Sequence, residues 1–249
     1  MATVPSPAAE PQAGISPFGR IVGVFFSPKA TFEDIVRKPN WLMPMALILV
    51  MSLAAIIALN SHFSWHDYIS QQIEKSPRAA QLSAEAKEKQ VEISAKYSPA
   101  VAYVLGPLVP ICGILVIALT LWGAFSIMAG LGTNYKTALA IVSHAVVPAS
   151  VISTILFITV LFLKPVGTFD LDNPIATNVA ALLSDDASKW LVALGKNLDL
   201  LELWKLLLLS IGFAAVSPKK LQGGRAFSIV FGAFLVYLVL RVGIAFAFS

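Results

Sequence analysis

The chain has 249 residues, with 57% hydrophobic side chains, 13% charged side chains and a formal net charge of +4. Because soluble domains carry about 25% charged residues, this composition excludes an ordinary water-soluble domain and favours a membrane protein. The basic residues are scattered among short segments and form no stripe, which argues against a nucleic-acid partner. The single cysteine, Cys112, excludes an intrachain disulfide and any multi-cysteine metal centre.

The first residues, 1–17, are rich in proline, alanine and polar side chains and contain no lysine or arginine. A cleaved signal peptide needs a basic start followed by an apolar core. We therefore expect residues 1–17 to form a disordered tail, and residues 18–249 to form one membrane domain.

The segment after the tail is apolar and aromatic from Phe18 onward, but Pro28 interrupts it after about ten residues, too few to cross a bilayer. Phe32, Ile35 and Val36 then follow at helical spacing. This pattern predicts an N-terminal interfacial, amphipathic segment that lies against the lipid headgroups. The alternative is a short linker packed on the other helices.

Five apolar stretches have the length of membrane-spanning helices, and they predict an all-α polytopic membrane protein with five transmembrane helices. Glycines and prolines crowd the first half of the second stretch, which predicts a kink there. The fourth stretch begins with Asp199, Glu202 and Lys205. Acidic residues at the start of a helix are stabilised by the helix dipole, and we prefer this interpretation to an acid–base cluster. The five stretches cover residues 41–59, 100–131, 137–163, 198–216 and 227–248.

Two longer polar segments, residues 60–99 and 164–197, separate these stretches and are expected outside the membrane. The first is rich in Ala, Glu and Lys, which predicts one or two surface helices. Lysine and arginine are equally frequent on the two sides, but the long segments also gather the acids. Short loops carry the positive-inside rule, so we expect the N-terminus inside and the C-terminus outside.

Ionisable residues inside a membrane are the default candidates for function, and they single out His144 and Arg241. A proton relay or substrate contact is one interpretation. The other is that His144 bonds a neighbouring backbone carbonyl and that Arg241 reaches the membrane surface with its long side chain.

Other motifs for chemistry are weak. His62 and His66 have a spacing that can hold a divalent metal on a helix, but Trp65 beside them favours an interfacial anchor. The sequence contains no GxSxG, HExxH or Walker motif. We therefore expect no catalytic residue, no metal and no cofactor.

Hydroxyl side chains gather in the second and third stretches, next to small residues. Close helix packing explains this composition, and a polar substrate path is the alternative. Transporters often show internal repeats, and none is visible here. The hydroxyl residues are Thr120, Ser126, Ser143, Ser150, Ser153, Thr154 and Thr159.

Two motifs resemble the bacterial branch of the Yip (Ypt/Rab-interacting protein) domain family. Residues 28–32 match its P-x-x-x-F segment before the first span, and residues 132–148 match its small-residue turn and following helix. The resemblance adds Gly132 and Pro148 to the candidate functional residues, and His144 stands where the family commonly has a tyrosine. It extends over most of the chain and implies five helices in a non-enzymatic, multi-pass protein. A bacterial relative of this kind is expected in the cytoplasmic (inner) membrane.

Eukaryotic relatives in that family are implicated in vesicle traffic, Rab GTPase binding and membrane shaping. The leading hypothesis is accordingly a non-enzymatic integral membrane protein with an organising or membrane-trafficking-like role, whose partners are the lipid bilayer and other membrane proteins or further copies of itself. The alternative is a small-solute or ion transporter with a polar path along the third stretch, lined by Ser143, His144, Ser150 and Thr154. An intramembrane enzyme is a third hypothesis.

Overall fold

The computed structural model describes residues 14–76, 79–165, 168–184, 186–222 and 224–247. Within these ranges every regular element is helical, apart from an isolated antiparallel bridge between Asn178 and Asp199. The predicted all-α class is therefore confirmed. Residues 1–13 of the predicted tail lie outside the described residues, and so does Phe248, the predicted end of the last span.

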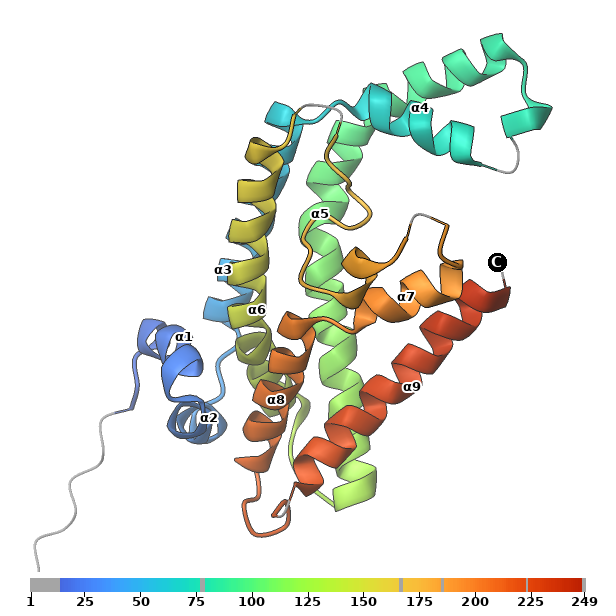
Figure 1. The fold of residues 1–249 in the computed structure, drawn as a ribbon. Coiled ribbons are helices and arrows are strands. Elements are labelled where there is room, and N and C mark those ends of the chain that lie inside the picture. Colours follow the sequence, from blue (N-terminus) through green and yellow to red (C-terminus); the bar gives the residue numbers. More distant parts are fainter. Residues whose placement is uncertain (1–13, 77–78, 166–167, 185, 223, 248–249) are drawn as a thin grey trace, which may run out of the picture.

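Four helices in the described part of the chain are long and apolar enough to cross a bilayer, and those over residues 42–62, 84–129 and 135–163 lie side by side (Figure 1). The fourth predicted stretch holds a shorter helix, α8 (Leu200–Ala214), of 15 residues. Its length of about 22 Å is less than the roughly 30 Å of a hydrocarbon core, so length supports four spans and leaves the fifth unconfirmed. The four are α3 (Leu42–His62), α5 (Ala84–Ala129), α6 (Tyr135–Leu163) and α9 (Arg225–Ala247).

Helix α5 differs from the prediction because the surface helix and the second span form one continuous helix of 46 residues. The Ser83 hydroxyl caps its start by accepting from the amide of Ala86, and Gly130 ends it in the left-handed conformation that favours glycine. Pro99 lies between the charged first part and the apolar second part. Figure 1 shows the helix changing direction between these parts, as a proline without an amide hydrogen allows.

A short helix, α4 (Trp65–Lys75), packs against α5 at the end of the bundle that is opposite to the turn between α5 and α6 (Figure 1). It follows α3 after a two-residue break, so His62 ends one helix and His66 belongs to the next. The two imidazoles therefore do not share a helix face, which the metal-binding interpretation of their spacing required.

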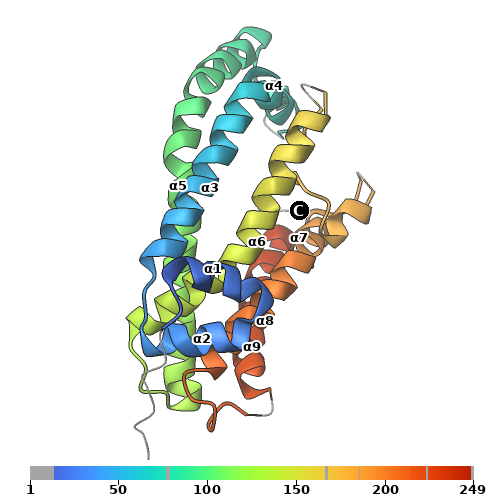
Figure 2. The same ribbon diagram turned by 90° about the vertical axis from the view of Figure 1, so that its left-hand side faces the viewer.

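Two short helices, α1 (Pro17–Phe26) and α2 (Pro28–Arg37), form the N-terminal helix pair. Proline at the first position of a helix loses no hydrogen bond, and Pro28 accordingly ends the first helix and starts the second. The pair packs across α6 and α8 at one end of the bundle (Figure 2), where Phe32 and Ile35 are fully buried. Two short helices thus occupy the predicted N-terminal segment, and side-chain packing holds them on the bundle.

The core is centred on the first half of α6, where every residue from Thr137 to Pro148 is buried. Asn134 caps this helix by accepting from the amide of Thr137 at 2.8 Å. Helices α3, α5 and α8 surround it. Gly212 lets α8 approach α6 closely, because a Cβ atom there would lie 2.5 Å from the Ile141 side chain.

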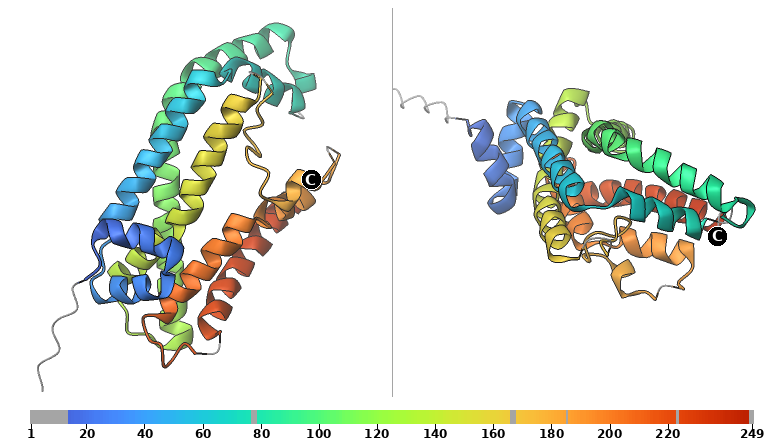
Figure 3. Two further views of the ribbon diagram at one scale, coloured as in Figure 1. Left: turned by 60° about the vertical axis from the view of Figure 1, so that its left-hand side comes forward. Right: turned by 90° about the horizontal axis from the view of Figure 1, so that it is seen from above.

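The second polar segment folds back onto the bundle. It contains a 3₁₀ turn, η2 (Val179–Leu182), and a helix, α7 (Lys189–Asn197), which packs on α9. Figure 3 shows α8 and α9 meeting the other long helices at one end of the bundle and diverging from them toward the other. As a result, α8 begins beside the middle of its neighbours.

Candidate functional site: a cavity in the middle of the bundle

A cavity of about 630 Å³ lies between α3, α5, α6 and the start of α8. We call it the mid-bundle cavity. Ser52 is the central residue of the 21-residue α3, and Ser150 lies next to the centre of the 29-residue α6; both line the cavity. In helices that cross a membrane, this position corresponds to the middle of the bilayer, where polar side chains are costly and mark functional sites.

Asp199 holds the start of α8 at the level of the mid-bundle cavity. Its Oδ1 atom accepts hydrogen bonds from the amides of Leu201 at 2.8 Å and Glu202 at 3.2 Å, as a helix N-cap does. Its Oδ2 atom accepts from the Thr177 hydroxyl at 2.5 Å. Asp199 is therefore a structural carboxylate that attaches the returning segment to the first turn of α8.

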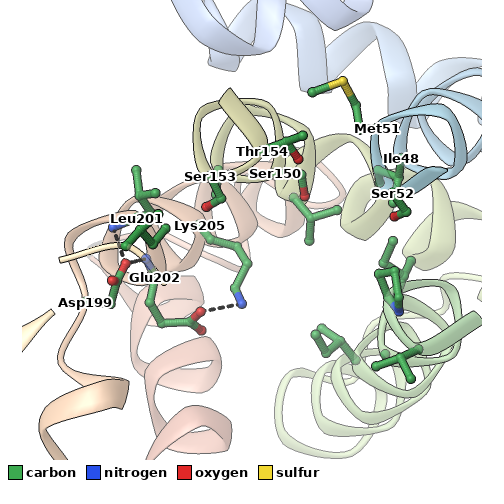
Figure 4. A pocket seen from close by; sticks show the side chains of 18 of the residues that line it. Ile48, Met51, Ser52, Ser150, Ser153, Thr154, Asp199, Leu201, Glu202 and Lys205 are labelled. Atoms are coloured by element: carbon green, nitrogen blue, oxygen red, sulfur yellow. Dashed lines mark hydrogen bonds and ion pairs between the residues drawn. The ribbon is translucent and has the colours of Figure 1, made fainter. Parts of the chain in front are cut away.

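Glu202 and Lys205 lie one turn further along α8 and form an ion pair, with Lys205 Nζ 2.5 Å from Glu202 Oε2. Their side chains remain 26% and 19% exposed. Figure 4 shows the Lys205 side chain reaching into the same hollow that Ser150 faces. The predicted interpretation of these charges as a helix-start pattern holds for Asp199, while Glu202 and Lys205 also line the cavity.

The hydroxyls on the other walls of the cavity differ from most buried hydroxyls of this protein in their hydrogen bonding. Buried serines in membrane helices usually donate to a carbonyl one turn earlier, as Ser210 does to Leu206 at 2.7 Å. In contrast, none of the cavity hydroxyls forms a hydrogen bond with another described residue. They belong to Ser52, Ser150, Ser153 and Thr154.

The polar path predicted along α6 divides into two environments. Ser150 and Thr154 line the cavity, but Ser143 and His144 lie in the core at 0% and 1% exposure. The Ser143 hydroxyl donates to the Ala140 carbonyl at 3.1 Å, and His144 Nδ1 lies 2.8 Å from the same oxygen. These two residues are thus occupied within their own helix.

The remaining candidate residues lie apart from the cavity. Pro148 is buried in the core of α6. Arg241 is exposed on α9 and contacts no charged or polar partner among the described residues. Gly132 is exposed in the turn before α6, where it lines a smaller hollow of about 380 Å³ with Thr133, Asn134 and Lys220 among others.

A buried ion pair inside the N-terminal helix pair was not predicted from the sequence. Arg20 Nε donates to Asp34 Oδ2 at 2.7 Å, and the two side chains are 7% and 6% exposed. A second guanidinium nitrogen donates to the Lys38 carbonyl at 2.9 Å. The available signal was a single cation in the otherwise apolar stretch 17–26, followed by an acid on the apolar side of the next helix.

Three polar residues at the cavity were not predicted from the sequence: Ser52, Lys196 and Asn197. Ser52 occurs in a uniformly apolar stretch, and Lys196 occurs in a segment that was expected outside the membrane.

Comparisons with known proteins assign a family. No curated protein and no solved structure matches the chain. A family model described as the Yip1 domain matches residues 22–244, a range that includes the Glu202–Lys205 ion pair, the mid-bundle cavity, helices α3, α5 and α6 and most of α9. The chain therefore belongs to the Yip1 domain family of membrane proteins.

Proposed function

We propose that this Yip1 domain protein is a non-enzymatic membrane-organising protein of the bacterial inner membrane, with a membrane-trafficking-like role. In this proposal it acts on the lipid surface through the N-terminal helix pair. The N-terminus is inside and the C-terminus outside, and α8 together with the segment before it makes the fifth crossing.

The observation that carries the proposal is the two-sided character of α1. One side buries Ile21 and Val24 against the bundle. The other exposes Phe18, Val22 and Phe26, at 66%, 42% and 82% of their surfaces. Large apolar side chains spaced along one face of a short helix are typical of a helix that lies in the lipid interface.

The N-terminal helix pair can transmit force to lipid because it is rigidly attached. Phe32 and Ile35 bury the α2 side of the pair, and the Arg20–Asp34 ion pair joins its two helices. Helix α1 therefore has a fixed depth relative to the bundle. A wedge held at a fixed depth displaces headgroups on one side of the bilayer, which supports a role in shaping or sorting membrane.

Spin labels test the location of α1. A nitroxide at residue 22, introduced as Val22→Cys in a Cys112→Ser background, should be accessible to oxygen and protected from a water-soluble nickel chelate. A matched label at Lys87, on the charged first part of α5, should show the opposite. Equal nickel accessibility at both positions would place α1 in water and refute the proposal.

The effect on membranes is tested by replacing all three exposed residues, Phe18, Val22 and Phe26, with serine. We expect this variant to lose the deformation of giant vesicles that the reconstituted wild-type protein produces. A control with Ile93→Ser and Tyr97→Ser removes exposed apolar groups from the start of α5 and should behave as wild type. Unchanged deformation by the triple variant would contradict an organising role.

A second candidate function, small-solute or ion transport, is favoured by the free hydroxyls of the mid-bundle cavity. Cysteines at Ser52, Ser150 and Thr154 in the Cys112→Ser background should react with water-soluble thiol reagents if water reaches the cavity from either side. A cysteine at the buried Ser143 should stay unreactive. Labelling that is absent from all three cavity positions would rule out an aqueous path.

A further inference from the structure

We propose that the mid-bundle cavity binds a zwitterionic group, an ammonium joined to a phosphate, as in the headgroup of an ethanolamine phospholipid. This inference is independent of the interfacial role of α1, because it rests on different residues at a different level of the bundle. The same chemistry occurs in a soluble phosphoethanolamine ester, and the experiment below separates the two sources.

The charges that line the cavity balance. Lys196 and Lys205 supply two positive charges, and Asp199 and Glu202 supply two negative ones. Burying a net charge inside a membrane protein is expensive. A zwitterion leaves the occupied cavity neutral, whereas an anion or a cation alone does not.

The anionic half of the ligand is matched by Lys196. This side chain is half-buried at the end of α7 and lines the cavity, and it forms no hydrogen bond or ion pair with another described residue. Asp199, the nearest acid in the sequence, already accepts three hydrogen bonds. Lys196 is therefore a cation without a partner, which a phosphate oxygen would supply.

Hydroxyl groups complete the anionic half. Ser150, Ser153 and Thr154 occupy neighbouring positions along α6 and line the cavity with unused donors. A phosphate presents several acceptor oxygens, so it can use these donors and a lysine together. A carboxylate has fewer oxygens and would leave more of them unpaired.

The ammonium half is matched by Glu202. Lys205 contacts only its Oε2 atom, and Oε1 has no partner among the described residues. A primary ammonium carries three N–H donors, so it can bond to Oε1 while Lys205 keeps Oε2. The ion pair thus orients the carboxylate and leaves one oxygen available.

The remaining walls favour an amphiphile over a fully soluble ligand. Ile48, Met51, Ile114, Ile117 and Val146 line the cavity on α3, α5 and α6. These side chains suit the glycerol and the first methylene groups of a lipid, and pockets of roughly 300–1,000 Å³ are typical of small-molecule sites. The cavity volume of about 630 Å³ falls within that range.

Native mass spectrometry of the full chain in detergent tests the proposal. The probes are dioleoylphosphatidylethanolamine, dioleoylphosphatidylglycerol and the soluble ester glycerophosphoethanolamine. We expect the ethanolamine lipid to be retained at least tenfold more strongly than the glycerol lipid. Retention of the soluble ester at the same affinity as the lipid would identify a soluble source for the same chemistry, and a large preference for the lipid would identify the membrane.

Three variants assign the site. Glu202→Gln should abolish the preference for ethanolamine, and Lys196→Met should weaken both lipids by roughly tenfold or more, since a hydrogen bond to a charged group is worth about 1.5–3 kcal/mol. Ser150→Ala/Ser153→Ala keeps every charge and should weaken both lipids less. Lys164→Met changes the same charge on an exposed residue outside the cavity and should bind as wild type.

Each outcome decides the question. Equal retention of the two lipids by the wild type, wild-type selectivity in Glu202→Gln, or wild-type affinity for both lipids in Lys196→Met overturns the inference. Measurements of helix content and thermal unfolding check that each variant keeps its fold. If this inference fails, the results expected of the vesicle test do not change: the wild type deforms vesicles and the triple α1 variant does not. Failure of the inference is therefore distinguishable from failure of the organising role.

Discussion

The ion pair Arg20–Asp34 and the ion pair Glu202–Lys205 have similar chemistry and opposite surroundings. The first is buried at 7% and 6% exposure and is completed by a bond to a backbone carbonyl. The second keeps 19% and 26% exposure and faces the mid-bundle cavity. In a chain with only 13% charged residues, the first, closed pair holds two helices together, and the second, open pair leaves polar atoms accessible to a ligand.

The largest expected effect comes from breaking the closed pair. Arg20→Met leaves the Asp34 carboxylate buried without its cation, and loss of one partner of a buried pair costs about 3–5 kcal/mol. The variant Arg20→Met/Asp34→Leu removes both charges and should recover most of that loss. Thermal unfolding in detergent measures the difference. A double variant as unstable as the single one would contradict a buried-charge penalty.

A smaller effect is expected at the start of α8. Asp199→Ala removes the two capping bonds and the bond from Thr177 and should cost about 2 kcal/mol. Amide hydrogen exchange should accelerate at Leu201 and Glu202. Asp199→Asn keeps an acceptor oxygen and should protect those amides nearly as well as the wild type. Equal acceleration in both variants would show that the carboxylate charge matters more than the cap.

Breaking the open pair should cost little stability. Lys205→Met leaves Glu202 facing the cavity, where it retains access to polar surroundings, so we expect a loss below about 1 kcal/mol. Its unfolding temperature should lie close to that of the wild type and well above that of Arg20→Met. A loss as large as that of Arg20→Met would mean that the two pairs serve the same structural purpose.

The smallest effect sharpens the contrast among hydroxyls. Ser150→Ala removes a side chain without a hydrogen-bond partner among the described residues and should change stability by less than about 0.5 kcal/mol. The matched variant Ser210→Ala removes a bond of 2.7 Å and should cost about 1 kcal/mol. A larger loss for Ser150→Ala would assign that hydroxyl to packing.

The long helices could be predicted from the sequence because each contains an apolar run with few charges. Helix α3 begins and ends within three residues of its predicted limits. The joining of the surface helix to α5 could not be predicted, because Pro99 indicates a break. Whether a helix continues through a proline depends on neighbours that satisfy the freed carbonyl, and these come from elsewhere in the chain.

The cavity was beyond sequence reasoning for a related reason. Ser52, Ser150 and Glu202 are far apart in the chain, and periodicity within one helix carries no information about the rotation of the next. Of the four residues of the alternative polar path along α6, Ser150 and Thr154 line the cavity, whereas Ser143 and His144 lie in the core. The Arg20–Asp34 pair was missed because it joins two helices across the break at Pro28.

The continuous helix α5 also has a mechanical consequence. Its 46 residues correspond to about 69 Å, more than twice the thickness of a hydrocarbon core. The same helix lines the mid-bundle cavity at Gly113 and carries α4 near its far end. It therefore resembles a lever, in which a tilt of about 10° at the cavity moves the far end by about 7 Å. Spin-label distances between the start of α5 and α9, measured with and without the ethanolamine lipid, would detect that movement.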